Sequence, residues 1–250
     1  MTYNLIGDIH GRNSWRQLLR EDAVNIFLGD YLDPYARDNV QAGIEDYDNL
    51  VDIIRHKQEH PDTTVLLLGN HDLHYLWSEH YSRYNPTHAK RMASLLREHL
   101  HLFQAAYAIQ DRILVTHAGV TRPWLRLAGI ADRQSASDLA DSICLCMDDE
   151  HIRQLFSVEA TFSPDDYCGT SPTASPIWVR PQTLLDYGQL ADHQGQTIYQ
   201  VVGHTQIAQI MQVESLVFID CLGTSPQSLL ISFDAAGTPT FTPITPNIGK

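Results

Sequence analysis

The stretch from Phe27 to Asp33, FLGDYLD, passes from an apolar run into two carboxylates, Asp30 and Asp33. Four other stretches share its design: an apolar run ends at Gly or Thr and is followed by a residue able to bind a metal. They are YNLIGDIHG (3–11), TVLLLGNHD (64–72), RILVTHAG (112–119) and IYQVVGHTQ (198–206). Short apolar runs without alternation are typical of strands that are buried on both faces. The sequence therefore predicts five buried strands that deliver polar residues at their ends.

The segments between these runs indicate an α/β arrangement. Helix-compatible segments near 13–20 and 46–60 separate the first three runs, and this alternation predicts a βαβαβ unit with parallel strands. Segments 88–100 and 135–156 also have helical patterns, whereas 157–176, rich in Ser, Pro, Thr and Asp, predicts an ordered loop or cap. Short strands are expected near 207–213, 216–220 and 228–233, followed by a Pro/Thr-rich tail.

Length and composition limit the class of protein. A chain of 250 residues with 43% hydrophobic residues is within the range of one α/β domain, and we expect a single domain over 1–250. The net charge of −13 argues against a nucleic acid polymer as partner, because such binding needs clustered Lys and Arg. No window has the apolar length of a membrane span, and no secretion signal is recognisable, so we expect no membrane partner and a cytoplasmic location.

Six residues at the strand ends are candidate metal ligands. They are Asp8, His10, Asp30, Asn70, His117 and His204. Ligands of α/β sheets bind beyond the carboxyl ends of the strands, where these side chains are expected. Oxygen and imidazole ligands without thiolate suit Mn²⁺, Fe²⁺ or Zn²⁺, and six are too many for one ion that keeps an open position. We therefore expect two divalent ions, with Asp30 as the natural bridge between them.

The five motifs resemble those of the calcineurin-like metallophosphoesterases, most closely the serine/threonine phosphoprotein phosphatase branch. The resemblance covers about residues 3–222 and rests on Gly7-Asp8-Ile9-His10-Gly11, Gly29-Asp30-Tyr31-Leu32-Asp33, Gly69-Asn70-His71-Asp72, Thr116-His117-Ala118-Gly119 and Gly203-His204-Thr205. It implies a two-sheet sandwich flanked by helices, in four αββα layers, with a helical or loop cap at about 120–195.

The resemblance also implies roles for single residues. Asp8, His10 and Asp30 would bind the first ion. The second ion would be bound by Asp30, Asn70, His117 and His204. His71 would protonate the leaving group, with Asp33 orienting its ring, and Asp220 would support a ligand histidine. The nine histidines outside the motifs, His74 among them, are expected to be solvated or packed.

One position departs from the family pattern. Relatives usually have Arg-Gly after the second aspartate, and that arginine binds the phosphate, whereas this chain has Pro34 and Tyr35. Candidates to replace it are Arg12, Arg37 and Arg180. Arg180 lies in PIWVRP, which resembles the family segment where a tryptophan precedes a phosphate-binding arginine. An arginine fork suits this task because it binds two phosphate oxygens at once.

The expected activity is hydrolysis of phosphomonoesters, in particular phosphoserine or phosphothreonine in a protein or peptide. The resemblance implies direct attack by a hydroxide that bridges the two ions, with Mn²⁺ the most expected metal and Fe or Zn as alternatives. Small phosphoesters remain alternative substrates, and so does a nucleotide anhydride such as diadenosine tetraphosphate. A non-catalytic scaffold that binds proteins is a further alternative, and the oligomeric state is left open.

Overall fold

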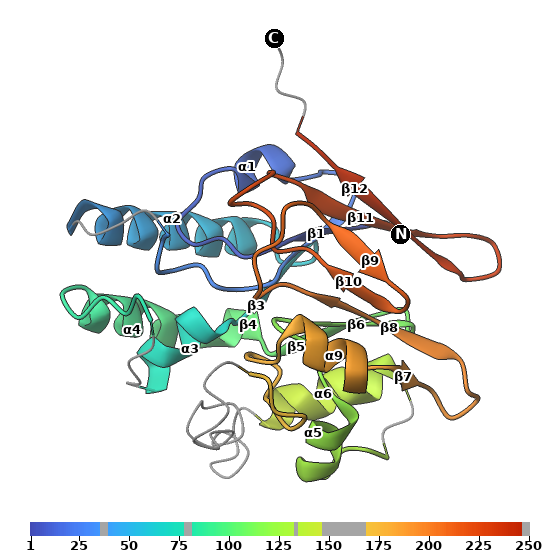
Figure 1. Cartoon of the computed structure of the whole chain (residues 1–250). Coiled ribbons are helices and arrows are strands. Elements are labelled where there is room, and N and C mark those ends of the chain that lie inside the picture. Colours follow the sequence, from blue (N-terminus) through green and yellow to red (C-terminus); the bar gives the residue numbers. More distant parts are fainter. Residues whose placement is uncertain (36–39, 78–81, 133–134, 147–168, 247–250) are drawn as a thin grey trace. The chain divides into compact units, whose positions relative to one another are not determined.

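The computed structural model describes residues 1–35, 40–77, 82–132, 135–146 and 169–246. The chain divides into two compact units. The first unit contains residues 1–104, 206–210 and 219–250, and the second contains residues 105–205 and 211–218. Each unit contains one sheet (Figure 1). The chain is thus a mixed α/β protein with two sheets flanked by helices, which confirms the expected fold class.

The sheet of the first unit has the strand order β12-β11-β1-β2-β3-β4. Its strands are β1 (Tyr3–Ile6), β2 (Val24–Phe27), β3 (Thr64–Leu67), β4 (Phe103–Gln104), β11 (Ser228–Phe233) and β12 (Pro239–Ile244). β1 to β4 are parallel, and β11 and β12 extend the sheet in antiparallel fashion. Every residue of β1, β2 and β3 is buried, as expected of apolar runs without alternation.

The helices of the first unit connect these parallel strands. They are α1 (Trp15–Leu18), α2 (Val40–Glu59), α3 (Asn70–Trp77) and α4 (Ala89–Glu98), followed by the 3₁₀ helix η1 (Leu100–Leu102). α2 packs against β3, and α3 packs against α4. The buried Trp15 of α1 donates a hydrogen bond from Nε1 to Oδ1 of Asn49 in α2, at 2.9 Å. The predicted βαβαβ unit is confirmed.

The sheet of the second unit has the order β5-β6-β8-β10-β9, with β7 also paired to β8. Its strands are β5 (Ala106–Ile109), β6 (Ile113–Thr116), β7 (Leu190–Ala191), β8 (Thr197–Val202), β9 (Met211–Val213) and β10 (Leu216–Phe218). Its helices within the described residues are α5 (Arg122–Leu127), α6 (Ala136–Cys146) and α9 (Pro181–Tyr187). α6 packs against β5 and β6, as Figure 1 shows. β6 and β8 are parallel, so their carboxyl ends point the same way.

Some elements differ from the sequence expectation. The expected tail contains β12, whose β-branched threonines pair with β11 at the sheet edge, where proline is tolerated. The expected strand at 207–213 is only β9, Met211–Val213. The predicted helix at 135–156 is α6 as far as Cys146, and its remainder and the loop at 157–168 lie outside the described residues.

Among the described residues, no helix combines the length and the apolar character needed to cross a membrane. Cys144 and Cys221 are free thiols.

Candidate active site

The turns after β1 and β2 hold three polar residues in the left-handed backbone region. The φ angles are 44° at His10, 51° at Asp30 and 60° at Asp33. Such conformations cost on the order of 1–3 kcal/mol each and persist where the surrounding structure fixes them. Here the two turns pair with each other, because His10 N donates to Asp30 O at 2.6 Å and Gly11 N donates to Tyr31 O at 2.9 Å. The strained turns therefore present fixed side chains.

The turn after β3 lies against the turn after β2. A Cβ atom on Gly69 would lie 2.1 Å from Oδ1 of Asp30, so only glycine fits at this position. Directly beyond it, the backbone N–H of His71 donates to the same Oδ1 at 2.8 Å. Asp30 is thus held by the segment that carries Asn70 and His71, the first two residues of α3.

Asp72, in the first turn of α3, fixes these turns together. Its buried carboxylate accepts hydrogen bonds from the backbone N–H groups of Asp30 at 2.8 Å, Tyr31 at 2.9 Å and Gly69 at 2.9 Å. A carboxylate in the first turn of a helix is also favoured by the helix dipole. The sequence pattern indicated Asp72 only as part of a motif and did not predict this role.

Asp8, His10 and Asp30 form the first buried cluster, with their ligand atoms within 4.8 Å of one another. Nδ1 of His10 donates to Leu32 O at 2.8 Å, while Nε2 lies 3.4 Å from Oδ2 of Asp30. Burial lowers the pKa of His10 to about 3, so its ring is neutral at physiological pH, the form that binds metal. Two carboxylates and one imidazole with a fixed tautomer fit a divalent ion.

Asp220, also in the first unit, lies beside Asp8. Burial raises the pKa of Asp220 to about 7, and the charge of Arg12 and a hydrogen bond with Asp8 oppose this rise. Arg12 donates from Nη1 to the backbone oxygens of Asp8 at 3.2 Å and Ile9 at 3.4 Å. Asp220 therefore contacts Asp8, and Arg12 supports the turn that carries Asp8.

Asp33 is the centre of a second buried cluster in the first unit. Its Oδ2 lies 2.7 Å from Nδ1 of His71 and 2.8 Å from Nε2 of His74, and its Oδ1 accepts from Tyr75 Oη at 2.5 Å. Burial alone would raise the pKa of Asp33, but hydrogen bonds from His71 and His74 outweigh it and lower the pKa. An ionised Asp33 held by these contacts orients the ring of His71.

His74 was expected to be solvated or packed, and it is fully buried in contact with Asp33. It lies one helical turn beyond His71, which is the spacing that places two side chains on one helix face. This spacing was the available signal for His74.

Arg83 is a site residue that the sequence did not predict. Its Nη1 donates to Asp33 O at 2.8 Å, and its Nη2 donates to Nε2 of His71 at 2.9 Å. Because a guanidinium only donates, Nε2 of His71 is the acceptor and its ring hydrogen is on Nδ1, facing Asp33. The Arg83 charge also disfavours a cation among Asp33, His71 and His74, although their ligand atoms are close enough for one.

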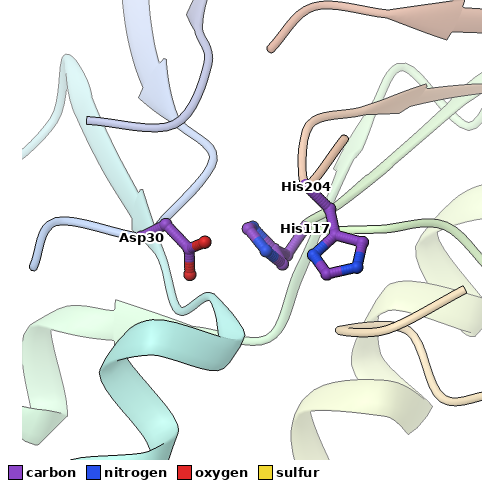
Figure 2. Close-up of side chains that lie close together, drawn as sticks. All are labelled: Asp30, His117 and His204. Carbon is purple, nitrogen blue, oxygen red and sulfur yellow. The ribbon is translucent and has the colours of Figure 1, made fainter. Parts of the chain in front are cut away.

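The second unit contributes two histidines from parallel strands. His117 follows β6 and His204 follows β8, with ring centroids 5.2 Å apart, and Gly203 N donates to His117 O at 2.7 Å. The backbone at His204 is left-handed, with φ of 66°. Figure 2 shows both rings and also Asp30 on the turn after β2 of the first unit.

Arg180 lies beside His204 within the second unit. Its Nη1 donates to Oγ1 of Thr205 at 3.1 Å, and the Trp178 ring meets the His204 ring edge to face at 5.4 Å. Arg180 precedes α9 and is partly buried. Of the other proposed phosphate ligands, Arg12 supports the turn after β1, and Arg37 lies outside the described residues.

This fold, with buried Asp and His clusters at the strand ends, defines the class as a metal-dependent phosphoesterase. The family model for calcineurin-like phosphoesterase matches residues 1–205, so the chain belongs to the calcineurin-like phosphoesterase family.

Solved structures share the fold at low sequence identity. A cold-active protein-tyrosine phosphatase from a psychrophilic Shewanella has a TM-score of 0.55 and 17% identity, covering 96% of this chain and 80% of that one. A protein serine/threonine phosphatase from Saccharomyces cerevisiae, with similarity to human phosphatase PP5, has a TM-score of 0.57 and 14% identity, covering 98% and 80%. At these identities the likeness establishes the fold.

Proposed function

We propose that the protein hydrolyses phosphomonoesters, with phosphoserine or phosphothreonine in proteins as the substrate class. The observation that carries this proposal is the placement of His71. Its backbone N–H donates a hydrogen bond to Oδ1 of Asp30, one of the expected ligands. Its ring nitrogen Nδ1 lies 2.7 Å from Oδ2 of Asp33. An acid/base group is thereby fixed beside a buried cluster of metal-ligating side chains, as phosphoester hydrolysis requires.

The metal ligands proposed for the first ion are Asp8, His10 and Asp30. For the second ion we propose Asp30, Asn70, His117 and His204, on the basis of family membership and motif order. Bound divalent ions, with Mn²⁺ the favoured metal, would supply a nucleophile at neutral pH by lowering the pKa of water, and would polarise the phosphate.

His71 is proposed to protonate the leaving oxygen from Nε2. Asp33 holds Nδ1, and Asp33 itself is fixed by His74 and Tyr75. A serine or threonine alkoxide is a poor leaving group, so a positioned proton donor contributes about 10²–10⁴-fold to its departure. Because attack on phosphorus is direct, no phosphorylated residue of the chain is needed.

Support for a phosphoprotein substrate comes from the solved structures, whose names describe protein phosphatases of different amino acid specificity. The second candidate is a nucleotide anhydride such as diadenosine tetraphosphate. It is favoured by Pro34 and Tyr35, which stand where protein phosphatases of the family have Arg-Gly. We place the activity in the cytoplasm, where the free thiols of Cys144 and Cys221 would stay reduced.

The substrate proposal is tested with purified, Mn²⁺-loaded protein and two substrates at equal concentration, a phosphoserine peptide and diadenosine tetraphosphate. The proposal predicts a higher kcat/KM for the phosphopeptide. A higher kcat/KM for diadenosine tetraphosphate would contradict the proposal and support hydrolysis of a nucleotide anhydride instead. Binding of less than one metal ion per chain after reconstitution would instead support the non-catalytic scaffold.

A further inference from the structure

The position that should hold a phosphate-binding arginine is Pro34, so the chain lacks a cation at that point of the turn. Arg83 enters the same neighbourhood from another segment, between α3 and α4. We propose that Arg83 binds the phosphate of the substrate in place of the arginine missing at Pro34. This inference rests on the proposed phosphomonoesterase function and names a residue for its substrate.

The contacts of Arg83 place its guanidinium next to the reacting groups of the first unit. Nη1 bonds to the backbone oxygen of Asp33 at 2.8 Å, the residue directly before Pro34, and Nη2 bonds to Nε2 of His71 at 2.9 Å. These two contacts use only two of the five N–H groups of the guanidinium. Each Nη atom therefore keeps a second N–H group, and the guanidinium lies beside the proposed proton donor.

Tyr35 explains why the guanidinium stays at this position. The Cζ atom of Arg83 lies 3.8 Å from the centroid of the Tyr35 ring, and the same ring meets the ring of His10 edge to face at 4.8 Å. Tyr35 stands where relatives have glycine, which offers no such surface. Stacking on an aromatic face leaves the edge of a guanidinium open for bidentate bonds to phosphate oxygens. In place of the Arg-Gly pair of relatives, this chain therefore has no arginine at position 34, and Tyr35 provides the aromatic surface on which Arg83 stacks.

Arg12 also lies near Tyr35, with Cζ 5.2 Å from the ring centroid. It directs Nη1 at the backbone oxygens of Asp8 and Ile9, as expected of a residue that supports the turn after β1.

A substrate phosphate would compete with His71 for Arg83. A dianionic phosphate is a stronger acceptor for a guanidinium than a neutral imidazole nitrogen. When Nη2 turns from His71 to the phosphate, Nε2 of His71 becomes free to bind a proton from water, and the resulting imidazolium can pass that proton to the leaving oxygen. Arg83 therefore links substrate binding to the availability of the proton donor.

The test compares wild type with Arg83→Ala, Arg83→Lys and Arg91→Ala, all loaded with Mn²⁺. Arg91 is the matched control because its guanidinium also covers a tyrosine, Tyr47, at 3.5 Å, on the outside of the unit. Two quantities are measured: the Kd of inorganic phosphate by calorimetry, and KM and kcat for p-nitrophenyl phosphate. Manganese content and Tm of each variant show whether the metal site and the fold are intact.

We expect Arg83→Ala to weaken phosphate binding and to raise KM by about 10-fold or more, with unchanged manganese content. Arg83→Lys should recover part of the loss, since the charge remains but the fork does not, and Arg91→Ala should match wild type. Phosphate affinity of both Arg83 variants within twofold of wild type would overturn the inference. Absence of phosphate binding and hydrolysis in the wild type would overturn the proposed function itself. If Arg83→Ala does not fold, Arg83→Lys decides alone.

Discussion

His71 has its two ring nitrogens assigned to different partners. Nδ1 faces the carboxylate of Asp33, and Nε2 accepts from Arg83. Nδ1 therefore fixes the orientation of the ring, and Nε2 is the nitrogen that would transfer the proton. A carboxylate orients a catalytic imidazole in the same way in other enzymes. If His71 protonates the leaving group, its loss should lower kcat without loss of metal. If His71 bound a metal ion, its loss should lower the metal content.

We expect His71→Asn to retain its metal ions and to lower kcat, most strongly for substrates with poor leaving groups. The loss should be about 10²-fold or more for an alkyl phosphate and much smaller for p-nitrophenyl phosphate, whose leaving group needs little protonation. Steady-state kinetics with both substrates, together with metal analysis, measure this. Equal losses of kcat for the aryl and alkyl substrates would contradict the role of His71.

Asp46 provides a prediction about pH. Its Oδ2 accepts from Asp33 N at 3.1 Å, and burial, with the nearby charge of Asp33, raises the pKa of Asp46 to about 8. The unfolded chain has a pKa of about 3.9 at this group, so the folded state binds the proton more tightly. The resulting stabilisation is complete below about pH 4 and is lost as the pH rises through about 8.

Asp46→Asn removes this titrating group, so the free energy of unfolding should depend less on pH. One pKa unit corresponds to about 1.4 kcal/mol, so the metal-free variant should lose a few kcal/mol less stability between pH 5 and pH 9 than wild type. Urea unfolding with chelator present measures the difference, and Asp48→Asn, on the exposed face of the same helix, is the control. Parallel profiles for wild type and Asp46→Asn would show that Asp46 is ionised throughout.

Sequence patterns predicted the residues that directly follow buried strands and did not predict those that depend on distant contacts. Asp8, His10 and Asp30 could be expected together because β1 and β2 are parallel neighbours. Arg83 carries no such signal, since its position depends on how the segment after α3 returns to Tyr35. His74 and Asp46 required the helix faces of α3 and α2 to be known.

At the scale of elements, the turns after β2 and β3 meet at the first turn of α3. Asp72 accepts three backbone N–H groups from the turns after β2 and β3. Backbone donors that are buried without an acceptor each cost about 1–3 kcal/mol. The relative position of the two turns, and therefore the position of Asp30, depends on the carboxylate of Asp72.

We expect Asp72→Ala to destabilise the protein by about 3 kcal/mol or more, because three buried donors lose their acceptor. Asp72→Asn should be affected less, because its single oxygen can still accept from Asp30 N and Gly69 N. Urea unfolding of the metal-free proteins measures both changes. A destabilisation below about 1 kcal/mol for Asp72→Ala would show that the turns hold their geometry without it.

Element boundaries were predictable where the hydrophobic pattern was strong and not elsewhere. The apolar runs correctly predicted β1, β2, β3, β6 and β8, because parallel strands that are buried on both faces need apolar residues on both faces. β12 was missed because its prolines and alternating exposure suit only a sheet edge, which tertiary pairing with β11 creates. α3 was not expected because it begins at Asn70, inside the motif that directly follows the buried run of β3.

For the whole molecule, the calcineurin-like family and the fold of two sheets with helices establish a metal-dependent phosphoesterase. The first unit supplies Asp8, His10 and Asp30, together with the Asp33 and His71 pair. The second unit supplies His117 and His204. The proposed reaction requires both units, because neither contains all six proposed ligands.

The central claim is that these ligands support hydrolysis at two divalent ions. It is tested most directly by titrating metal-free protein with Mn²⁺ while following p-nitrophenyl phosphate hydrolysis at a protein concentration well above the metal Kd. We predict negligible activity without metal and a rate that reaches its plateau at two equivalents per chain. A plateau at one equivalent, or hydrolysis that does not depend on added metal, would contradict the two-ion account.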